Sequence, residues 1–260
     1  MYRDIFVIGE YYHVYNRGNR KETIFYEEKD MWRFLQTIRF FNDIHSSLNL
    51  LRDFSSKGSL KRKSLLKSDF NKLNDFNKHS VFNLGWPKNW PDREPLVKIL
   101  CYCLLPNHFH LFLKEIRKGG ISKFMQKVGT GFSKYSNTKY QNVGRIFQGP
   151  YKIKIIPEQR YLEYLMVYIQ VINVLNLFPG GIDEALKNPK KAIGFVDNYS
   201  FSSHPDYTGL RKSLIIDKDI LGKIFSTPEK YKEFVYQTLA GKNLSQGENI
   251  SEILGNLTLE

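Results

Sequence analysis

Apolar residues recur along the chain with two periods, and these periods predict its elements. Strand-like patterns, with apolar runs or alternation, occur at residues 10–16, 96–103, 108–114 and 146–156. Helical spacing, with apolar residues every three or four positions, occurs at residues 27–42, 121–140 and 158–176. The order is strand, helix, strand, strand, helix, strand, helix. The first six elements predict an α+β fold with a ferredoxin-like split βαβ core and an antiparallel sheet.

Two segments lie outside this core. Residues 43–95 are rich in Ser, Asn and Lys, carry a basic cluster at residues 57–67 and show little periodicity, which predicts a lid-like or partly disordered insertion. It is either a tolerated surface loop or an additional arm that contacts nucleic acid, with Trp86 and Trp90 as candidates for base stacking. Residues 181–260 predict a helical C-terminal extension with a helix at 228–240. We therefore expect a domain over residues 1–180, interrupted at 43–95, followed by this extension.

Charge favours an anionic partner. The chain has a formal net charge of +13 and a pI of about 9.5. Between Lys114 and Lys154 the sequence contains ten Lys and Arg residues and one acid, Glu115. A surface that is merely solvated mixes the two signs more evenly. This segment therefore predicts a contact with nucleic acid.

The sequence predicts neither a signal peptide nor a membrane span. Residues 1–10 contain Arg3, Asp4 and Glu10 and lack the apolar core of a signal peptide. The longest uncharged run, residues 164–182, is too polar and too broken for a membrane span. Two cysteines, Cys101 and Cys103, fit a reducing compartment. We expect a soluble cytoplasmic protein with no membrane partner.

A hairpin with two histidines provides the candidate chemistry. Two apolar runs flank the turn dipeptide Pro106-Asn107, and His108 and His110 begin the second run. Side chains alternate across a strand, so both imidazoles share a face and can bind one divalent cation. Two alternatives stay open on spacing alone. The histidines are ordinary hydrogen-bonded residues at a turn, or they join Cys101 and Cys103 in a structural zinc site.

Several ordered motifs resemble the IS200-like (HUH) tyrosine transposases, in particular the REP-associated tyrosine transposases. The motifs cover most of residues 11–210 and are, in order, Y-H-V-Y-N-R-G-N-R from Tyr12, C-L-L-P-N-H-F-H-L-F-L from Cys103, I-S-K-F-M-Q-K-V-G from Ile121, G-R-I-F-Q-G-P-Y-K from Gly144, R-Y-L-E-Y-L-M-V-Y-I from Arg160 and Y-S-F-S-S from Tyr199. The resemblance implies the same ferredoxin-like core and a catalytic domain within residues 1–180.

The resemblance also implies an activity. In these enzymes the two histidines bind a divalent metal and a tyrosine on a later helix attacks single-stranded DNA. The implied nucleophile is Tyr168, with Tyr161 and Tyr164 as alternatives on the same helix. The implied metal ligands are His108 and His110, with Mg²⁺ or Mn²⁺ as the cofactor. Single-stranded or hairpin DNA is the implied partner, and the oligomeric state is open, with a homodimer as one option.

Two positions depart from the family pattern. Pro150 stands where the family usually has Arg, and Ile172 stands where a polar side chain completes the metal shell. Asn173 follows directly, but an ideal helix rotates it by about 100° from Ile172. It is a candidate third ligand only if the helix is over-wound or contains a one-residue bulge. Otherwise His13 on the first strand is the next candidate.

Basic and polar residues near these motifs are the expected DNA contacts. They are Arg17, Arg20, Lys123, Lys127, Arg145, Gln148, Lys152 and Lys154. The favoured function is a metal-dependent transesterase that cleaves and rejoins single-stranded DNA through a 5′-phosphotyrosine. A non-catalytic DNA-binding relative and a zinc module are the alternatives.

Overall fold

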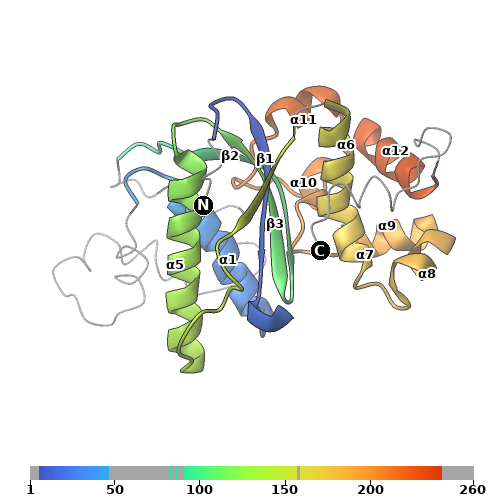
Figure 1. Cartoon of the computed structure of the whole chain (residues 1–260). Helices are drawn as coiled ribbons and strands as arrows, with labels where there is room; N and C mark the ends of the chain where they lie inside the picture. Colours follow the sequence, from blue (N-terminus) through green and yellow to red (C-terminus); the bar gives the residue numbers. More distant parts are fainter. Residues whose placement is uncertain (1–5, 47–81, 83–85, 87–90, 157–158, 242–260) are drawn as a thin grey trace.

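The structure is a computed structural model that describes residues 6–46, 82, 86, 91–156 and 159–241. Four strands form its sheet: β1 (Tyr11–Arg17), β2 (Val97–Leu105), β3 (His108–Glu115) and β4 (Lys152–Ile155). The strand order is β2-β3-β1-β4, and every neighbouring pair is antiparallel. This order is that of a split βαβ arrangement, and it confirms the predicted α+β fold (Figure 1).

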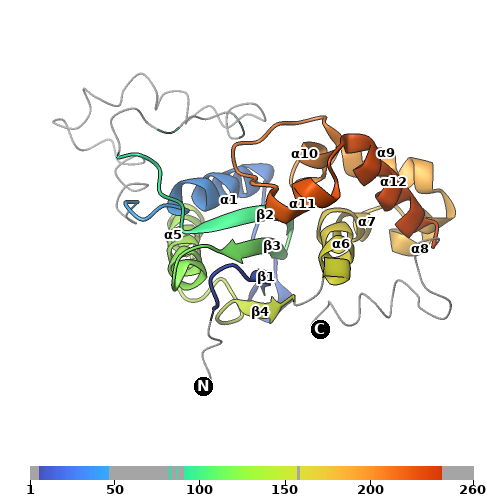
Figure 2. The ribbon, with the colours of Figure 1, turned by 90° about the horizontal axis from the view of Figure 1, so that it is seen from above.

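Two helices, α1 (Glu28–Phe41) and α5 (Gly120–Tyr140), cover one face of the sheet (Figure 2). A capping box between Glu27 and Asp30 starts α1. The buried Asp30 carboxylate also accepts hydrogen bonds from Tyr135, Lys139 and Tyr140, so it joins α1 to α5. The apolar stripe of α1 packs with Phe109 and Leu111 of β3 in one core.

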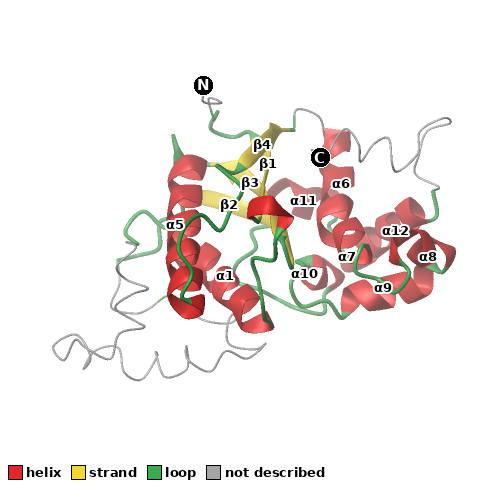
Figure 3. Cartoon of the chain, turned by 60° about the horizontal axis from the view of Figure 1, so that its bottom comes forward, coloured by secondary structure: helices red, strands yellow, loops and turns green. Residues whose placement is uncertain are grey.

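The other face is covered by the helical segment that follows β4. This segment runs through α6 (Gln159–Val167), a π-helical turn at Tyr168–Ile172 and α7 (Asn173–Leu175). The remaining described helices lie on the same side of the sheet, opposite α1 and α5 (Figure 3). They are α8 (Gly181–Lys187), α9 (Pro189–Asp197), α10 (His204–Thr208), α11 (Asp219–Ile224) and α12 (Pro228–Leu239). Two of them contact β2 directly, because Tyr207 donates to the carbonyl of Leu100 and Asp219 pairs with Lys98.

One apolar cluster on this face contains side chains from both predicted segments. It includes Leu100 and Phe112 of the sheet, Leu165 of α6, and Tyr207 and Tyr231 of the C-terminal helices. The extension therefore completes the core on the second face. The division into two units at residue 180 stays a prediction.

Most predicted elements lie within two residues of the observed ones, but the last strand is shorter than expected. Residues 146–156 predict a strand, whereas β4 comprises only Lys152–Ile155. Pro150 has no backbone N–H to donate, which favours a break before β4. Ile146 and Gln148 instead bond to the turn after β1, where Ile146 O accepts from Asn19 N and Gln148 N donates to Arg17 O.

The insertion at 43–95 lies largely outside the described residues. Its two ends are joined, because Ile44 N donates to Glu94 O and Glu94 N donates to Asp43 Oδ2. Trp86 packs on Phe40 at 6.1 Å between ring centroids. Among the described helices, none combines the length and the apolar character that crossing a membrane requires.

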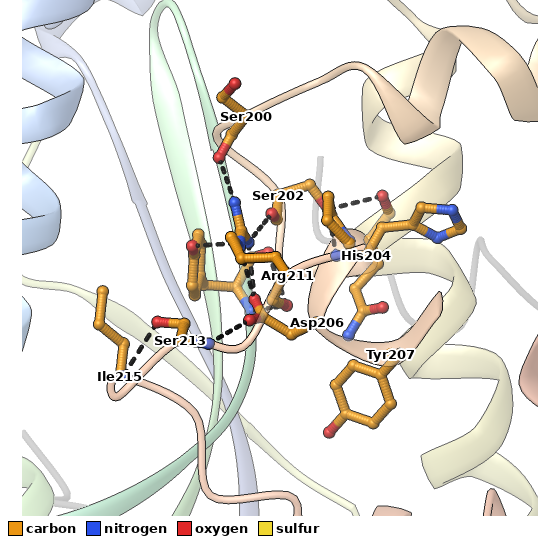
Figure 4. A network of polar contacts seen from close by, with 12 residues as sticks. Ser200, Ser202, His204, Asp206, Tyr207, Arg211, Ser213 and Ile215 are labelled. Carbon is orange, nitrogen blue, oxygen red and sulfur yellow. Dashed lines mark hydrogen bonds and ion pairs between the residues drawn. The ribbon is translucent and has the colours of Figure 1, made fainter. Parts of the chain in front are cut away.

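A buried ion pair connects the C-terminal segment to β2 and to the π-helical turn (Figure 4). Arg211 donates to Asp206 Oδ2 at 2.7 Å, to the carbonyl of Ser202 at 2.6 Å and to the hydroxyl of Tyr102 at 3.1 Å. Ser202 Oγ in turn donates to the carbonyl of Gln170 at 2.8 Å. This network fixes the segment after α9 against the turn that contains Tyr168.

We expect Arg211→Met to lower the free energy of unfolding by about 3–5 kcal/mol, because it leaves the Asp206 carboxylate buried without its cation. Urea denaturation measures this loss. Lys187→Met is the control, since Lys187 pairs with Glu184 on the surface with side chains 71% and 53% exposed, and it should cost at most about 0.5 kcal/mol. Equal losses in the two variants would contradict the assigned role of the buried pair.

Candidate active site

The two histidines of the hairpin lie on the face of the sheet that the π-helical turn covers. The ring of His110 lies 5.5 Å from that of Tyr168, and His108 lines the same cavity. Phe109 points to the opposite face, where it contacts Phe34 of α1. The predicted alternation along this strand is therefore present.

Both imidazoles are oriented through Nδ1. His108 Nδ1 lies 2.6 Å from Asn107 Oδ1, and His110 Nδ1 lies 2.8 Å from His13 Nε2. An amide oxygen only accepts, so His108 carries its proton on Nδ1 and a lone pair on Nε2. His110 Nε2 is buried and has no hydrogen-bond partner in the part of the chain that the structure describes. A divalent cation would supply the partner that this nitrogen lacks, so the donor set fits a metal.

Burial keeps the three imidazoles neutral. It lowers the pKa of His108 to about 4, with a further contribution from the positive charge of Arg17. It lowers the pKa of His13 to about 3, with a contribution from Lys154, and that of His110 well below its ordinary value. Neutral imidazole is the form that binds metals, so these rings need not lose a proton to do so at pH 7.

Tyr168 is the tyrosine that the helix places against the histidines. Its ring lies edge-on to His110 at 5.5 Å and to His13 at 6.1 Å. Tyr161 and Tyr164, the alternatives from the sequence, do not line this cavity. Tyr164 contacts Phe234 of α12. Of the three, Tyr168 is the one in the geometry of the implied nucleophile.

The helix contains the irregularity that Asn173 requires. Residues Tyr168–Ile172 form a π-helical turn, in which the backbone N–H of Asn173 donates to the carbonyl of Tyr168. The side-chain Nδ2 of Asn173 donates to the same carbonyl at 2.9 Å. Because a carbonyl only accepts, the side-chain atom of Asn173 that bonds to it must be the amide nitrogen. The amide oxygen, Oδ1, is therefore the atom that can bind a metal ion. Asn173 and Ile172 both line the cavity with Tyr168.

These side chains share one cavity of about 570 Å³. Among the described residues, its lining contains no Asp or Glu, and the cations there are Arg17, Lys21 and Lys152. Arg17 Nε donates to Gln148 Oε1, which fixes the guanidinium at the rim. The imidazoles and amides of the cavity are neutral, and the described charged residues around them are cations. This charge distribution favours an anionic ligand such as a phosphodiester.

The structure separates the other predicted DNA contacts from this cavity. Lys123 and Lys127 are on α5, on the opposite side of the sheet, and Lys127 Nζ donates to Asp43 O and Ser46 Oγ. Arg145 lines a second cavity beside α5. Lys154 is the register partner of His13 on β4, so it lies beside the cavity without lining it. Arg20 lies in the turn after β1 and does not line the cavity either.

Two cations of the segment from Lys114 to Lys154 are held in ion pairs. Lys114 pairs with Asp219, and Lys139 pairs with Glu27 and Asp30, so neither is a free surface cation. A count of charges along the sequence omits side-chain alternation and strand register, which determine the face of the sheet on which each cation lies.

The cavity also contains residues that the sequence does not single out. Asn107 orients His108, and Lys21 adds a cation. The hydroxyl of Tyr15 is buried, beside His110, and no described residue is its hydrogen-bond partner. Asn107 Nδ2 donates to the carbonyl of Lys21, so the turn after β1 is joined to the hairpin turn. The contact joins residues 86 positions apart, which a local pattern cannot show.

The zinc alternative does not fit the geometry. Burial raises the pKa of both Cys101 and Cys103 above its ordinary value, which disfavours the thiolates that zinc binds. Within the described part of the chain, no three His, Cys, Asp or Glu side chains are arranged to hold a metal ion. The same result argues against His13 as a third ligand beside His108 and His110.

Comparison with known proteins identifies no family. No family model and no curated protein matches the chain. Among solved structures, a REP-associated tyrosine transposase bound to a REP hairpin is similar, with 15% sequence identity, coverage of 84% of this chain and 92% of that chain, and a TM-score of 0.39. A likeness at this level defines neither a family nor an activity, so the activity has to be inferred from the residues of the cavity.

We expect Asn173→Ala to weaken Mn²⁺ binding by about tenfold, because it removes the amide oxygen that is the candidate third ligand. Ile172→Asn should strengthen binding, because it adds a donor to the cavity wall. Isothermal titration calorimetry without DNA measures both changes. His108→Ala and His110→Ala should abolish binding while the fold is kept.

Asn176→Ala is the matched control, since Asn176 lines the same cavity in the turn that follows Asn173. It should leave the affinity unchanged. If Asn173→Ala and Asn176→Ala had the same effect, the π-helical turn would not present a ligand.

Proposed function

We propose that the protein is a metal-dependent single-stranded DNA transesterase of the transposase type, acting on hairpin or repeat DNA. The observation that carries the proposal is the position of Tyr168. Its ring lies against His110 in a basic cavity without carboxylates, where His108 and His110 offer Nε2 as a ligand. The ordered motifs of the sequence support the same activity.

Tyr168 supplies the nucleophile. In the proposed step its phenolic oxygen forms a bond to the phosphorus of a phosphodiester, and the bond between that phosphorus and the 3′ oxygen breaks. The phenolic proton is released and the 3′ oxygen takes up a proton, which leaves a 5′-phosphotyrosine and a free 3′-OH. Because one phosphodiester replaces another, attack by a 3′-OH reverses the step and joins strands.

The protein's other residues bind and orient the substrate. Arg17, Lys21 and Lys152 line the cavity and would bind phosphates of the substrate. Mg²⁺ or Mn²⁺ held by His108, His110 and Asn173 would stabilise negative charge on the phosphate oxygens. Two imidazoles and one amide oxygen suit Mn²⁺ better than Mg²⁺, which prefers an all-oxygen shell.

A non-catalytic DNA-binding protein is the second candidate. Pro150 and Ile172, the two departures from the family pattern, both line the cavity. Pro150 adds no cation and Ile172 adds no donor, which weakens phosphate and metal binding respectively. DNA binding by the wild type without any covalent product would favour this candidate.

We expect Tyr168→Phe to keep DNA binding and to lose the covalent adduct, because Phe has the same ring without the oxygen. The assay incubates the protein with end-labelled hairpin DNA and Mn²⁺ and detects an SDS-resistant band. Tyr161→Phe, Tyr164→Phe and Tyr15→Phe should retain the adduct. An adduct with Tyr168→Phe would show that another residue is the nucleophile.

Affinity for single-stranded DNA should fall steeply with salt, because phosphate contacts release counterions. Removing two contacts with Lys21→Ala and Lys152→Ala together should reduce the slope of log K against log salt by about 1.4. The control removes two exposed cations away from the cavity, with Lys123→Ala and Lys190→Ala. Equal slopes for the two double variants would exclude the cavity as the phosphate site.

A further inference from the structure

His13 and His110 form a hydrogen-bonded imidazole pair beside the cavity. Both side chains are buried, with exposed fractions of 1% and 5%. Their rings stack at 5.1 Å between centroids, and His13 Nε2 lies 2.8 Å from His110 Nδ1. The two remaining ring nitrogens, His13 Nδ1 and His110 Nε2, are buried and have no partner among the described residues. The pair therefore presents one unpartnered nitrogen on each ring.

A neutral pair of this kind has two proton arrangements. If His110 Nδ1–H donates to His13 Nε2, the lone pair of His110 is on Nε2. If His13 Nε2–H donates instead, His110 carries its second proton on Nε2 and cannot bind a cation there. Only the first arrangement makes His110 a ligand.

His108 offers an internal comparison. Its Nδ1 faces the amide oxygen of Asn107, whose assignment is fixed because Asn107 Nδ2 donates to the carbonyl of Lys21. His108 is thus restricted to the ligand form by an acceptor at Nδ1. His13 Nε2 occupies the corresponding place at His110 Nδ1.

We propose that His13 is a positioning residue that accepts the Nδ1 proton of His110 and holds the Nε2 lone pair of His110 toward the cavity. His13 is then no metal ligand, since its Nε2 accepts the hydrogen bond from His110. The consequence for metal binding rests on the function proposed above, whereas the proton arrangement itself does not.

The chemistry of the cavity gives a reason for a histidine at this position. A carboxylate is the more usual acceptor behind a ligating histidine. Here it would place a negative charge in a cavity whose described lining residues include cations and no acid. A neutral imidazole orients His110 without competing with a phosphodiester for Arg17 and Lys152.

The test compares His13→Gln with His13→Leu. Gln keeps an acceptor oxygen, whereas Leu fills a similar volume and has none. Nitrogen-15 NMR of the imidazoles in metal-free protein reports which nitrogen of His110 carries the proton. We expect Nδ1–H in the wild type and in His13→Gln, and Nε2–H in His13→Leu. Mn²⁺ binding, titrated without DNA, should weaken by about 10- to 100-fold in His13→Leu and by much less in His13→Gln.

His45→Leu is the control, because it makes the same kind of change at a histidine that bonds to Glu94 and does not line the cavity. It should change neither the proton arrangement nor the affinity. An Nε2–H signal for His110 in the metal-free wild type would overturn the proposal without any variant. Unchanged Mn²⁺ affinity in a folded His13→Leu would overturn it as well.

The adduct assay separates this inference from the proposed function. If His13→Leu forms the adduct at the same Mn²⁺ concentration that the wild type requires, the proposed role of His13 is wrong and the proposed transesterase activity is supported. If the wild type forms no adduct but the NMR and Mn²⁺ results are as expected, the role of His13 stands and the transesterase is wrong. An adduct that His13→Leu forms only at raised Mn²⁺ supports both.

Discussion

The π-helical turn at Tyr168–Ile172 determines which side chains face the histidines. In a regular α-helix, positions five residues apart differ by about 140° around the axis. The wider turn brings Asn173 to the side of Tyr168, with both in the wall of one cavity. Irregular turns of this kind are stable only where other groups satisfy the altered backbone. The geometry of the site thus depends on what holds this turn.

The C-terminal extension provides that support. Ser202 Oγ donates to the carbonyl of Gln170 inside the turn, and the hydroxyl of Tyr231 donates to Gln170 Oε1 at 2.6 Å. Tyr231 also bonds to His204, which bonds to Asp197. The helices from Gly181 onward are therefore part of the structural basis of the site. None of their described polar groups forms a hydrogen bond to His13, His108 or His110.

The sequence predicts the fold well because the fold depends on the spacing of apolar residues along each helix and strand. Alternation places His108 and His110 on one face, and the stripe of α1 marks its buried side. What the sequence does not predict depends on register and on a one-residue irregularity. The pairing of His13 with His110 joins positions 97 apart, and the sorting of Lys127 away from Lys152 depends on which side of the sheet each occupies. Asn173 can be a metal ligand only if the helix contains a bulge, and no local sequence pattern shows whether the bulge is present.

The most direct test of the account is to locate the covalent bond. The wild-type protein is incubated with hairpin DNA and Mn²⁺, the product is digested with protease and nuclease, and mass spectrometry identifies the peptide that carries a nucleotide. The account predicts a single modified residue, Tyr168, linked through a 5′ phosphate. A nucleotide on any other residue, or bound DNA without a covalent product, would contradict it.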